Sequence, residues 1–312
     1  MNKENFFTSN TRLFVIIPVV IIVAAILLSI FGLGMNIGID FAGGSLLKYE
    51  VGEQFEVSVV EEALAAAGIT DGQIAKTGSE QTTLEVRTKS LGDGSEDLRI
   101  TFEEKLAETY TGLDFITLDT VGATAGRDLI ANAVKSCLIV FVCLLIYIAI
   151  RFDLYSGVTA LIALCHDVLV MCAFMVFTRG FFQVNSSFIA AVLTIIGYSI
   201  NNTIIIFDRV RENSKLLQYK GASSKPLVEA SVRQTFARTM NTTITTLLTL
   251  VVLYICGVSA IREFVFPLIV GMLAGVYSSV FLSSQMWANL FDKKVFAPIT
   301  NLFKGKKATK KA

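Results

Sequence analysis

The sequence predicts a polytopic α-helical membrane protein with six transmembrane helices and one α+β domain inserted after the first helix. Two observations predict this fold class. The chain of 312 residues is 53% hydrophobic and only 17% charged, with a mean hydropathy of +0.63, whereas charged residues make up about 25% of a soluble domain. The charges are also grouped, so that long stretches of the chain contain almost none.

Six apolar runs are the predicted spans. They cover residues 13–31, 136–150, 154–177, 180–207, 239–261 and 264–291. A helix needs roughly 20 residues to cross the ~30 Å hydrocarbon core, and the short second run can extend back past Lys135, whose aliphatic stem can snorkel. Because only helices satisfy their own backbone groups in lipid, each run is expected to be helical. The first run is too long for a signal-peptide core and is followed by no Ala-x-Ala site, so it is expected to be retained.

The distribution of Lys and Arg predicts the topology. Basic residues are frequent before the first span, after the fourth span and in the tail, whereas the short loops on the opposite side carry only Arg179 and Arg262. We therefore expect a cytoplasmic N-terminus with the first span (1–34), an external or periplasmic domain (35–129), the other five spans (130–292) and a basic cytoplasmic tail (293–312). The tail is expected to be solvated, although anionic membrane lipids are candidate ligands for it. Nucleic acid is not an expected partner.

Residues 45–121 have the pattern of a ferredoxin-like domain. Strands are predicted at 45–51, 72–76, 82–88 and 115–121, with a turn at 78–81, and helices are predicted at 57–67 and 96–110. The resulting order, β-α-β-β-α-β, is that of the split βαβ unit. The domain contains no His and no Cys, which excludes a disulfide framework. We expect a binding or docking module without enzyme activity and without a cofactor.

Three further motifs are specific. Residues 38–44 read Gly-Ile-Asp-Phe-Ala-Gly-Gly, where Gly43 and Gly44 allow a sharp turn and Asp40 is expected to cap nearby backbone. Residues 121–126, with two glycines, are interpreted as a flexible hinge before the second span. Residues 196–213 place polar side chains inside the fourth span and a charged collar at its end.

In their combined order these motifs resemble the SecF family of bacterial Sec export subunits, and the similarity covers nearly the whole chain. It includes the GIDFAGG turn, His166-Asp167-Val168, the GYSIN…FDRVREN segment and Arg238-Thr239. The resemblance implies a six-span subunit, similar to half of an RND-type exporter. It would act with SecD and use H⁺ or Na⁺ flow to complete export of an unfolded preprotein through SecYEG, after the ATP-driven step of SecA. YajC is a further candidate partner.

The polar residues inside the spans are the candidate ion-coupling site. Asp167 in the third span would cost about 2.5–3.5 kcal/mol to insert, so it is either an ion-relay carboxylate or a structural hydrogen-bonding group. His166 is its neighbour, but consecutive helical residues are not expected to face each other. Similar SecF sequences usually have an Asp at the position of Asn202. Asn201 and Asn202 are neutral amides that cannot carry a proton, although a carbonyl oxygen can still bind a cation.

Arg238 opens the fifth span and matches a functional Arg of the family, so a carboxylate of the partner or Asp208 is an expected contact. A threonine stripe that includes Thr242 follows it, and packing or a polar ion path explains such a stripe. Gly271 and Gly275 form a GxxxG packing motif in the sixth span. The chain has one His and no ligand cluster, so no metal site is expected.

Two alternative functions stay open. One is a half-size RND-like exporter of a small molecule or a lipid. The other is a structural subunit that braces SecD without ion coupling of its own, which the amide of Asn202 would favour.

Overall fold

The structure, a computed structural model, describes residues 7, 11–77, 81–88, 95–216 and 223–292. The chain divides into two compact units. The described residues within 1–35, 136–179 and 188–292 form a helical bundle, and those within 36–135 and 180–187 form a smaller unit. The predicted basic tail (293–312) and residues 78–80 of the predicted turn lie outside the described residues.

Six helical spans are long and apolar enough to cross a membrane. Five are single helices: α2 (Thr11–Ile30), α6 (Ala123–Arg151), α7 (Leu154–Phe177), α8 (Ser186–Asn213) and α9 (Ser224–Cys256). The sixth consists of α10 (Ser259–Tyr277), the π-helical turn η4 (Ser278–Ser283) and α11 (Ser284–Asp292). The predicted polytopic fold with six spans is therefore confirmed. The π-helical turn in the sixth span is a feature that the apolar pattern does not predict.

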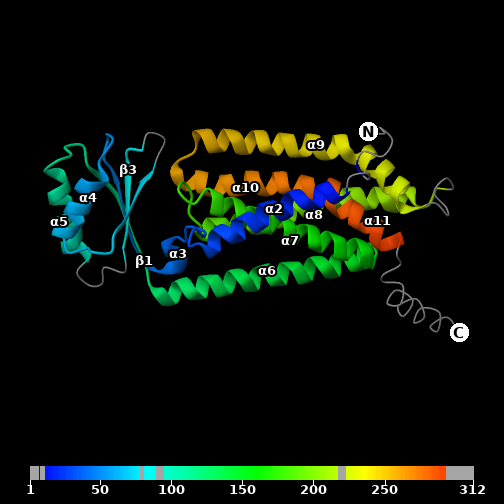
Figure 1. Cartoon of the computed structure of the whole chain (residues 1–312), viewed down its shortest axis with the longest axis horizontal. Helices are drawn as coiled ribbons and strands as arrows, with labels where there is room; N and C mark the ends of the chain where they lie inside the picture. The colour runs from blue at the N-terminus through cyan, green and yellow to red at the C-terminus, as the bar shows by residue number, and fades with distance from the viewer. Residues whose placement is uncertain (1–6, 8–10, 78–80, 89–94, 217–222, 293–312) are drawn as a thin grey trace. The chain divides into compact units, whose positions relative to one another are not determined.

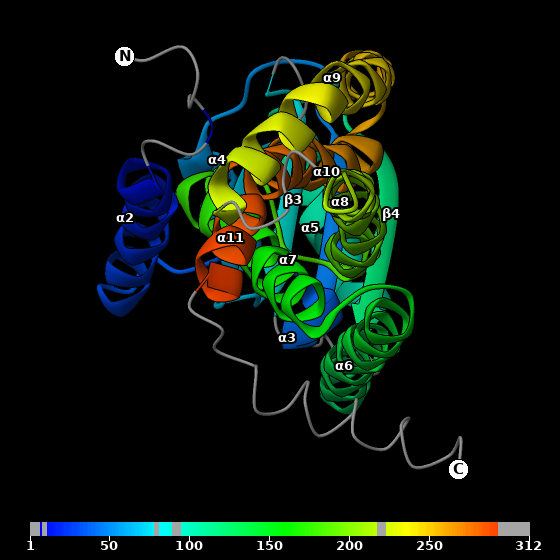
Figure 2. The same cartoon turned by 90° about the vertical axis from the view of Figure 1, so that its right-hand side faces the viewer.

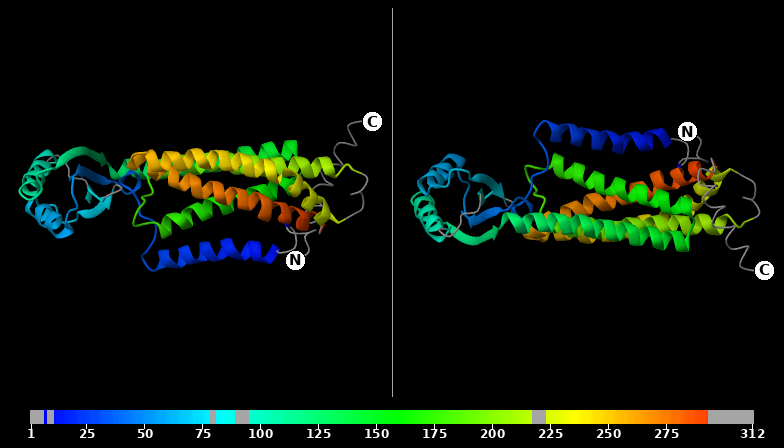
Figure 3. Two further views of the ribbon diagram at one scale, coloured as in Figure 1. Left: turned by 90° about the horizontal axis from the view of Figure 1, so that it is seen from above. Right: turned by 90° about the horizontal axis from the view of Figure 1, so that it is seen from below.

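Helix α7 is the central helix of the bundle. It packs against α2, α10, η4 and α11, and the end-on view shows it between its neighbours, with α2 and α6 at the periphery (Figure 2). The views in Figure 3 show the spans running lengthwise beside one another. Leu138, Ile139 and Val142 on α6 are each more than half exposed. Such apolar surface is suited to lipid or to another protein rather than to water.

Two glycines allow the sixth span to pack closely on α8. A Cβ atom at Gly271 would lie 2.6 Å from a side-chain carbon of Ile195, and one at Gly275 would lie 3.1 Å from Cβ of Ser199. A Cβ atom at Gly271 would force its neighbours to move, and one at Gly275 would require Ser199 to shift by a few tenths of an ångström, so both glycines permit the close approach of the helices. The predicted packing role of Gly271 and Gly275 agrees with these contacts.

The smaller unit has the predicted β-α-β-β-α-β order. Its elements are β1 (Gly44–Glu50), α4 (Val57–Ala66), β2 (Gln73–Thr77), β3 (Thr83–Thr88), α5 (Ser95–Ala107) and β4 (Asp114–Val121), labelled in part in Figure 1. The strands form one antiparallel sheet in the order β2-β3-β1-β4. Leu47, Tyr49, Leu84 and Val86 alternate along β1 and β3 and form a buried core with Phe102 and other residues of the helices. This is the ferredoxin-like arrangement.

The Gly-Gly turn starts β1. Gly43 and Gly44 have φ angles of +73° and +125°, which favour glycine. A Cβ atom at Gly44 would lie 2.5 Å from the carbonyl oxygen of Thr88. Before the turn, in the short helix α3 (Ile39–Ala42), Asp40 accepts hydrogen bonds from the backbone N–H of Ser186 at 2.8 Å and from its hydroxyl at 2.5 Å. Asp40 thus caps backbone, as expected, but the backbone belongs to the first residue of α8.

The predicted flexible hinge at residues 121–126 is wrong. Strand β4 ends at Val121 and helix α6 begins at Ala123, so Gly126 lies within a continuous helix. A Cβ atom at Gly126 would lie 2.7 Å from the carbonyl oxygen of Phe41. This glycine therefore permits close packing against α3 instead of providing freedom of movement.

Candidate functional site

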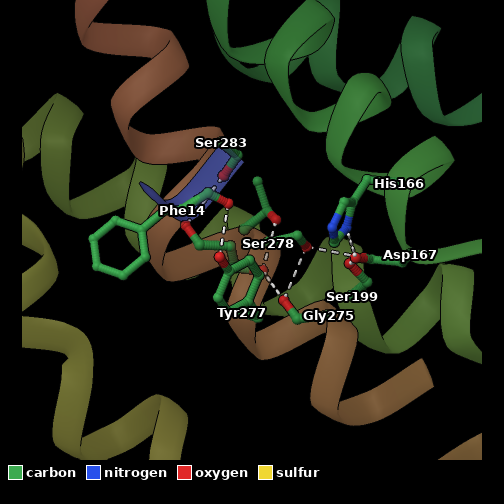
Figure 4. A network of polar contacts seen from close by, with 10 residues as sticks. Phe14, His166, Asp167, Ser199, Gly275, Tyr277, Ser278 and Ser283 are labelled. Carbon is green, nitrogen blue, oxygen red and sulfur yellow. Dashed lines mark hydrogen bonds and ion pairs between the residues drawn. The ribbon is translucent and has the colours of Figure 1, made fainter. Parts of the chain in front are cut away.

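Asp167 lies at the centre of a buried polar cluster inside the bundle. It is 1% exposed and occupies the middle of α7. An ionised carboxylate in such surroundings requires hydrogen-bond donors, because desolvation of an unpaired charge is costly. The structure places three donors around it (Figure 4).

Each carboxylate oxygen of Asp167 has its own partners. Nδ1 of His166 lies 2.9 Å from Oδ1. The hydroxyl of Ser199, on α8, donates a short hydrogen bond to Oδ2. Oγ of Ser278, in the π-helical turn, lies 3.0 Å from the same oxygen and 3.2 Å from the carbonyl oxygen of Gly275, so its single hydrogen can serve either acceptor. The cluster therefore joins α7, α8 and the sixth span through one carboxylate.

The contact between His166 and Asp167 contradicts the expectation that these neighbours do not face each other. Nδ1 is the ring nitrogen nearer to the backbone, so rotation of the side chain brings it back to the following residue. The imidazole is 9% exposed and stacks on the ring of Tyr277 at a centroid distance of 6.2 Å. The Tyr277 hydroxyl in turn donates to the carbonyl oxygen of Phe14 on α2 at 2.7 Å.

Asn201 and Asn202 lie on different sides of α8. Asn202 is 7% exposed and follows Ser199 by about one turn, whereas Asn201 is exposed. The buried side of the fourth span thus carries an amide one turn away from the ligands of Asp167. The amide of Asn202 does not ionise. The ionisable carboxyl group that the structure places in the buried interior between α7 and α8 is therefore that of Asp167.

Arg238 lies outside the buried polar cluster around Asp167. It is exposed and lines a cavity of about 490 Å³ between the ends of α6 and α8 and the first half of α9, together with Arg151, Asp208 and Arg209; Asp167 does not line this cavity. The expected contact of Arg238 with Asp208 is not formed; Asp208 accepts a hydrogen bond from Arg211 at 2.8 Å instead.

Thr242 is on the exposed side of α9, whereas Thr235 and Thr239 of the same threonine stripe are buried. The Thr242 hydroxyl is exposed and donates to the carbonyl oxygen of Arg238 at 2.9 Å, within the same helix. Thr246 and Thr249 likewise donate to carbonyl groups of α9. In this chain the outer part of the stripe therefore faces away from the bundle core. Among the described residues, no group of three or more metal-binding side chains occurs.

Ser199 and Ser278 are the functional candidates that sequence reasoning missed. Ser199 lies in the GYSIN motif, but the motif itself predicts no role for this serine. Ser278 belongs to the segment Ser-Ser-Val-Phe-Leu-Ser-Ser, in which two serine pairs five positions apart lie inside an apolar span, and this repeat is the signal in the sequence that points to it. The arrangement they complete, a carboxylate with two hydroxyl groups and an imidazole in contact, is suited to holding and releasing a proton.

Comparison with known proteins places the chain in a family. Residues 101–293 match the family model of the C-terminal part of the protein export membrane proteins SecD and SecF, and residues 28–54 match the model of their GG motif. The protein translocase subunit SecF of Calditerrivibrio nitroreducens is 34% identical over 91% of this chain and 94% of its own length. SecF of Rickettsia bellii is 36% identical over 86% and 88%.

Longer proteins contain the same unit. SecDF of Bacillus subtilis is 33% identical over 90% of this chain, which spans 37% of that protein. The crystal structure of SecDF, a translocon-associated membrane protein from Thermus thermophilus, matches with a TM-score of 0.75 at 30% identity, covering 91% of this chain and 37% of the other. With matches at this level over most of its length, the chain belongs to the SecF family of multi-pass membrane proteins.

Proposed function

We propose that this chain is an accessory subunit of the Sec protein translocase that works with a SecD-type partner and uses the ion-motive force to complete preprotein export through SecYEG, after the ATP-driven step of SecA. The names of its relatives support the translocase role, and the SecDF proteins, in which the matching unit is about a third of a longer chain, support the partnership with SecD. YajC is a further candidate partner.

The exposed polar face of α9 supports the need for a partner within the membrane. Arg238, Asn241, Thr242 and Thr245 are all exposed on this helix. Polar side chains are costly in contact with lipid. A second six-span subunit that covers this face would remove that cost, and a carboxylate on it would pair with Arg238. Co-purification tests this point: the tagged chain should retain a SecD-type protein, and Arg238→Ala should weaken both retention and export.

The ion coupling of this subunit is assigned to Asp167. The single observation that carries this proposal is the buried carboxylate with donors from α7, α8 and the sixth span. A change in its protonation would alter hydrogen bonds to three helices at once, which links ion binding to helix movement. Asn202 would then act as a neutral hydrogen-bonding group.

An export assay in inverted membrane vesicles tests the assignment. Asp167→Asn keeps the shape of the side chain but removes its charge. Export that is stimulated by the ion-motive force, and abolished by an ionophore, should disappear in this variant while ATP-driven export by SecA remains. The matched variant Asn201→Ala, at an exposed position on α8, should keep the stimulation. Normal stimulation with Asp167→Asn would reject the assignment.

A bracing subunit without ion coupling is the second candidate function, and the neutral Asn202 favours it. In that case Asp167→Asn would reduce the amount of the SecD complex rather than its response to the ionophore. A half-size RND-like exporter of a small molecule or lipid has no specific support in the cluster. The proposed orientation has both termini in the cytoplasm and residues 35–129 on the outer side of the cytoplasmic membrane. The distribution of Lys and Arg in the sequence supports this orientation.

A further inference from the structure

A cavity of about 630 Å³ lies at the end of the bundle where α6 and α8 end and where α7 and α9 begin, and α11 lines one side of it. We call it the end cavity. Seen from this end, the first turns of α9 lie beside α11 (Figure 2). The end cavity shares Arg151 and Phe152 with the cavity next to Arg238, but neither Arg238 nor Asp167 lines it. Cavities of ~300–1,000 Å³ are typical of sites for small ligands.

Two arginines supply positive charge to the end cavity. The guanidinium of Arg211 donates to the carbonyl oxygen of Arg151 at 3.2 Å and to Asp208 at 2.8 Å. Its Cζ lies 5.4 Å from the centroid of the Phe152 ring, within the range of a cation–π contact. Cζ of Arg151 lies 5.9 Å from the same centroid, and among the residues that the structure describes this guanidinium has no ion pair. One charge is thus fixed and paired, whereas the other is available to a ligand.

Two carboxylates near the end cavity cap helix ends and form no pair with Arg151. Asp153 lines the cavity and accepts a hydrogen bond from the backbone N–H of Ser156 at 2.6 Å, as the cap of α7. Asp292, the last residue of α11, accepts one from the backbone N–H of Ser224, the first residue of α9, at 3.0 Å. Carboxylates in this position interact with the positive end of the helix dipole. They therefore leave Arg151 to an anion from outside the chain.

Hydroxyl and basic side chains add further donors to the polar part of the end cavity. Ser214 and Ser224 line the cavity, and each is followed directly by an exposed lysine, Lys215 and Lys225. Ser223, just before α9, lines it as well. Hydroxyl and ammonium groups donate hydrogen bonds to anionic oxygens such as those of a phosphate. The donors thus come from the ends of several helices and meet at one place.

The rest of the wall is apolar and aromatic, and it consists of Phe207, Val210, Leu227, Trp287 and Phe291. Trp287 is 4% exposed, and its ring stacks on that of Phe291 at a centroid distance of 4.8 Å. Tryptophan rings and the long stems of arginines are characteristic of the headgroup level of a membrane. A cavity with donors on one side and apolar groups on the other fits a ligand that has an anionic head and an apolar body.

We propose that the end cavity binds the phosphate-bearing headgroup of an anionic phospholipid. Arg151 binds the phosphate with its planar fork, and the neighbouring lysines attract anionic lipid to the mouth of the cavity. A free phosphate ion has the same charge but makes no use of the aromatic wall, which is why a lipid is the assigned source. The bound headgroup holds the ends of α6, α7, α8, α9 and α11 together. This inference does not depend on the proposed ion coupling through Asp167.

Trp287 is the single tryptophan of the chain, so its fluorescence reports on the end cavity. The full chain, purified in a neutral detergent, is titrated with phosphatidylglycerol or phosphatidylcholine that carries bromine atoms near the top of the acyl chains, where bromine quenches a nearby indole. The brominated phosphatidylglycerol should quench at a lower concentration. Arg151→Gln should require about tenfold more of it, the factor that corresponds to about 1.4 kcal/mol, because a charge-assisted hydrogen bond is lost.

Arg209→Gln is the matched control. Arg209 lies at the same end of the bundle but does not line the end cavity, and Glu212 offsets its charge at 2.8 Å. This variant should titrate like the unchanged chain. The basic residues of 293–312 are the same in all three proteins, so the comparison isolates the cavity. Equal loss in Arg151→Gln and Arg209→Gln would mean general attraction of anionic lipid to a basic surface and would overturn the proposal, as would equal quenching by both brominated lipids.

Inorganic phosphate without lipid is the third arm of the titration, with chloride at the same ionic strength as its reference. No change in Trp287 fluorescence is expected. A saturable change in phosphate alone would assign the cavity to a free phosphate and would overturn the assignment to a lipid.

Thermal unfolding in detergent provides a second measurement that does not depend on fluorescence. A ligand that binds the folded chain raises its melting temperature. Phosphatidylglycerol should therefore stabilise the unchanged chain and Arg209→Gln, whereas Arg151→Gln should gain little. Each protein is compared with its own melting temperature without lipid, so that a folding defect does not hide the result. The same gain in all three proteins would refute a lipid site at Arg151.

Discussion

Oγ of Ser278 lies 3.0 Å from Oδ2 of Asp167, so a π-helical turn of the sixth span brings a hydroxyl within hydrogen-bond distance of the carboxylate in the middle of α7. The two residues are separated by 111 positions in the chain. Their contact is the point at which the sixth span joins the buried site, since Ser199 and His166 supply the other donors from α8 and α7.

Removal of this hydroxyl should destabilise the bundle. Ser278→Ala takes one donor from a buried carboxylate, and the expected loss in free energy of unfolding is about 1–3 kcal/mol. The matched control is Ser284→Ala, because Ser284 is also buried but donates to the carbonyl oxygen of Val280 in its own span at 2.5 Å. Its expected loss is below about 1 kcal/mol. Thermal unfolding of both variants in detergent measures the difference, and equal losses would contradict the role of Ser278.

The GxxxG motif gives a prediction for helix packing. In Gly271→Ala the new methyl would lie 2.6 Å from a carbon of Ile195 and 2.7 Å from the sulfur of Met171, so the two helices must separate slightly. We expect a loss of about 1–3 kcal/mol in the free energy of unfolding. Gly197→Ala is the control, since nothing lies within 4 Å of a Cβ there, and helix propensity favours Ala by about 1 kcal/mol. Denaturant unfolding of the purified chain should order the variants accordingly, and an unaffected Gly271→Ala would contradict close packing.

Sequence patterns predicted the spans and the order of strands and helices in the external domain, because apolar runs and two-residue alternation depend on local chemistry. They did not predict the site to the same depth. Asp167 was identified from its cost in lipid, but its partners Ser199 and Ser278 come from other spans. Which faces of α8 and the sixth span meet α7 is decided by packing, and a single sequence does not contain that information.

Glycine was the residue most easily misinterpreted. The two glycines in residues 121–126 suggest a hinge, but Gly126 instead allows the backbone of α6 to approach the carbonyl oxygen of Phe41 closely. A positive φ angle or a close backbone contact is a property of the folded chain, so the pattern alone does not distinguish flexibility from tight packing. The His166–Asp167 contact was missed for a related reason, because helix periodicity places Cβ atoms and not the ends of long side chains.

The Gly-Gly turn gives a third prediction. Gly44→Ala places a methyl 2.5 Å from the carbonyl oxygen of Thr88 at a φ of +125°, so both the turn and the pairing of β1 with β3 must change. The expected loss is about 3 kcal/mol or more. Gly68→Ala is the control: its φ is +78°, but nothing lies within 4 Å of the added Cβ, and about 1 kcal/mol is expected. Protease resistance of the external domain in the full chain should fall much further in Gly44→Ala, and similar resistance in both variants would contradict the tight turn.

Glu85 gives a prediction for the pH dependence of the external domain. Its side chain, on β3, is 2% exposed, and its Oε1 lies 2.6 Å from Nζ of Lys48 on β1. Burial alone would raise the pKa of this carboxyl, but the ion pair with Lys48 and the hydrogen bonds from Lys48 and Gln183 outweigh it, so the pKa lies below the ordinary value of 4.5.

A lowered pKa in the folded state means that the ionised pair stabilises the domain above pH 4.5, and that this stabilisation is lost as the pH falls through the lowered pKa. Hydrogen–deuterium exchange of the β1 and β3 peptides in the full chain, corrected for the intrinsic rate at each pH, should show this loss below pH 4.5. Glu85→Gln should cost about 1–3 kcal/mol at pH 7, because Lys48 loses its buried partner, and it should flatten the acid dependence. Glu108→Gln is the control, since Glu108 pairs with Lys105 at an exposed position where such pairs contribute little. An acid dependence that survives unchanged in Glu85→Gln would mean that another carboxyl controls the stability of the domain.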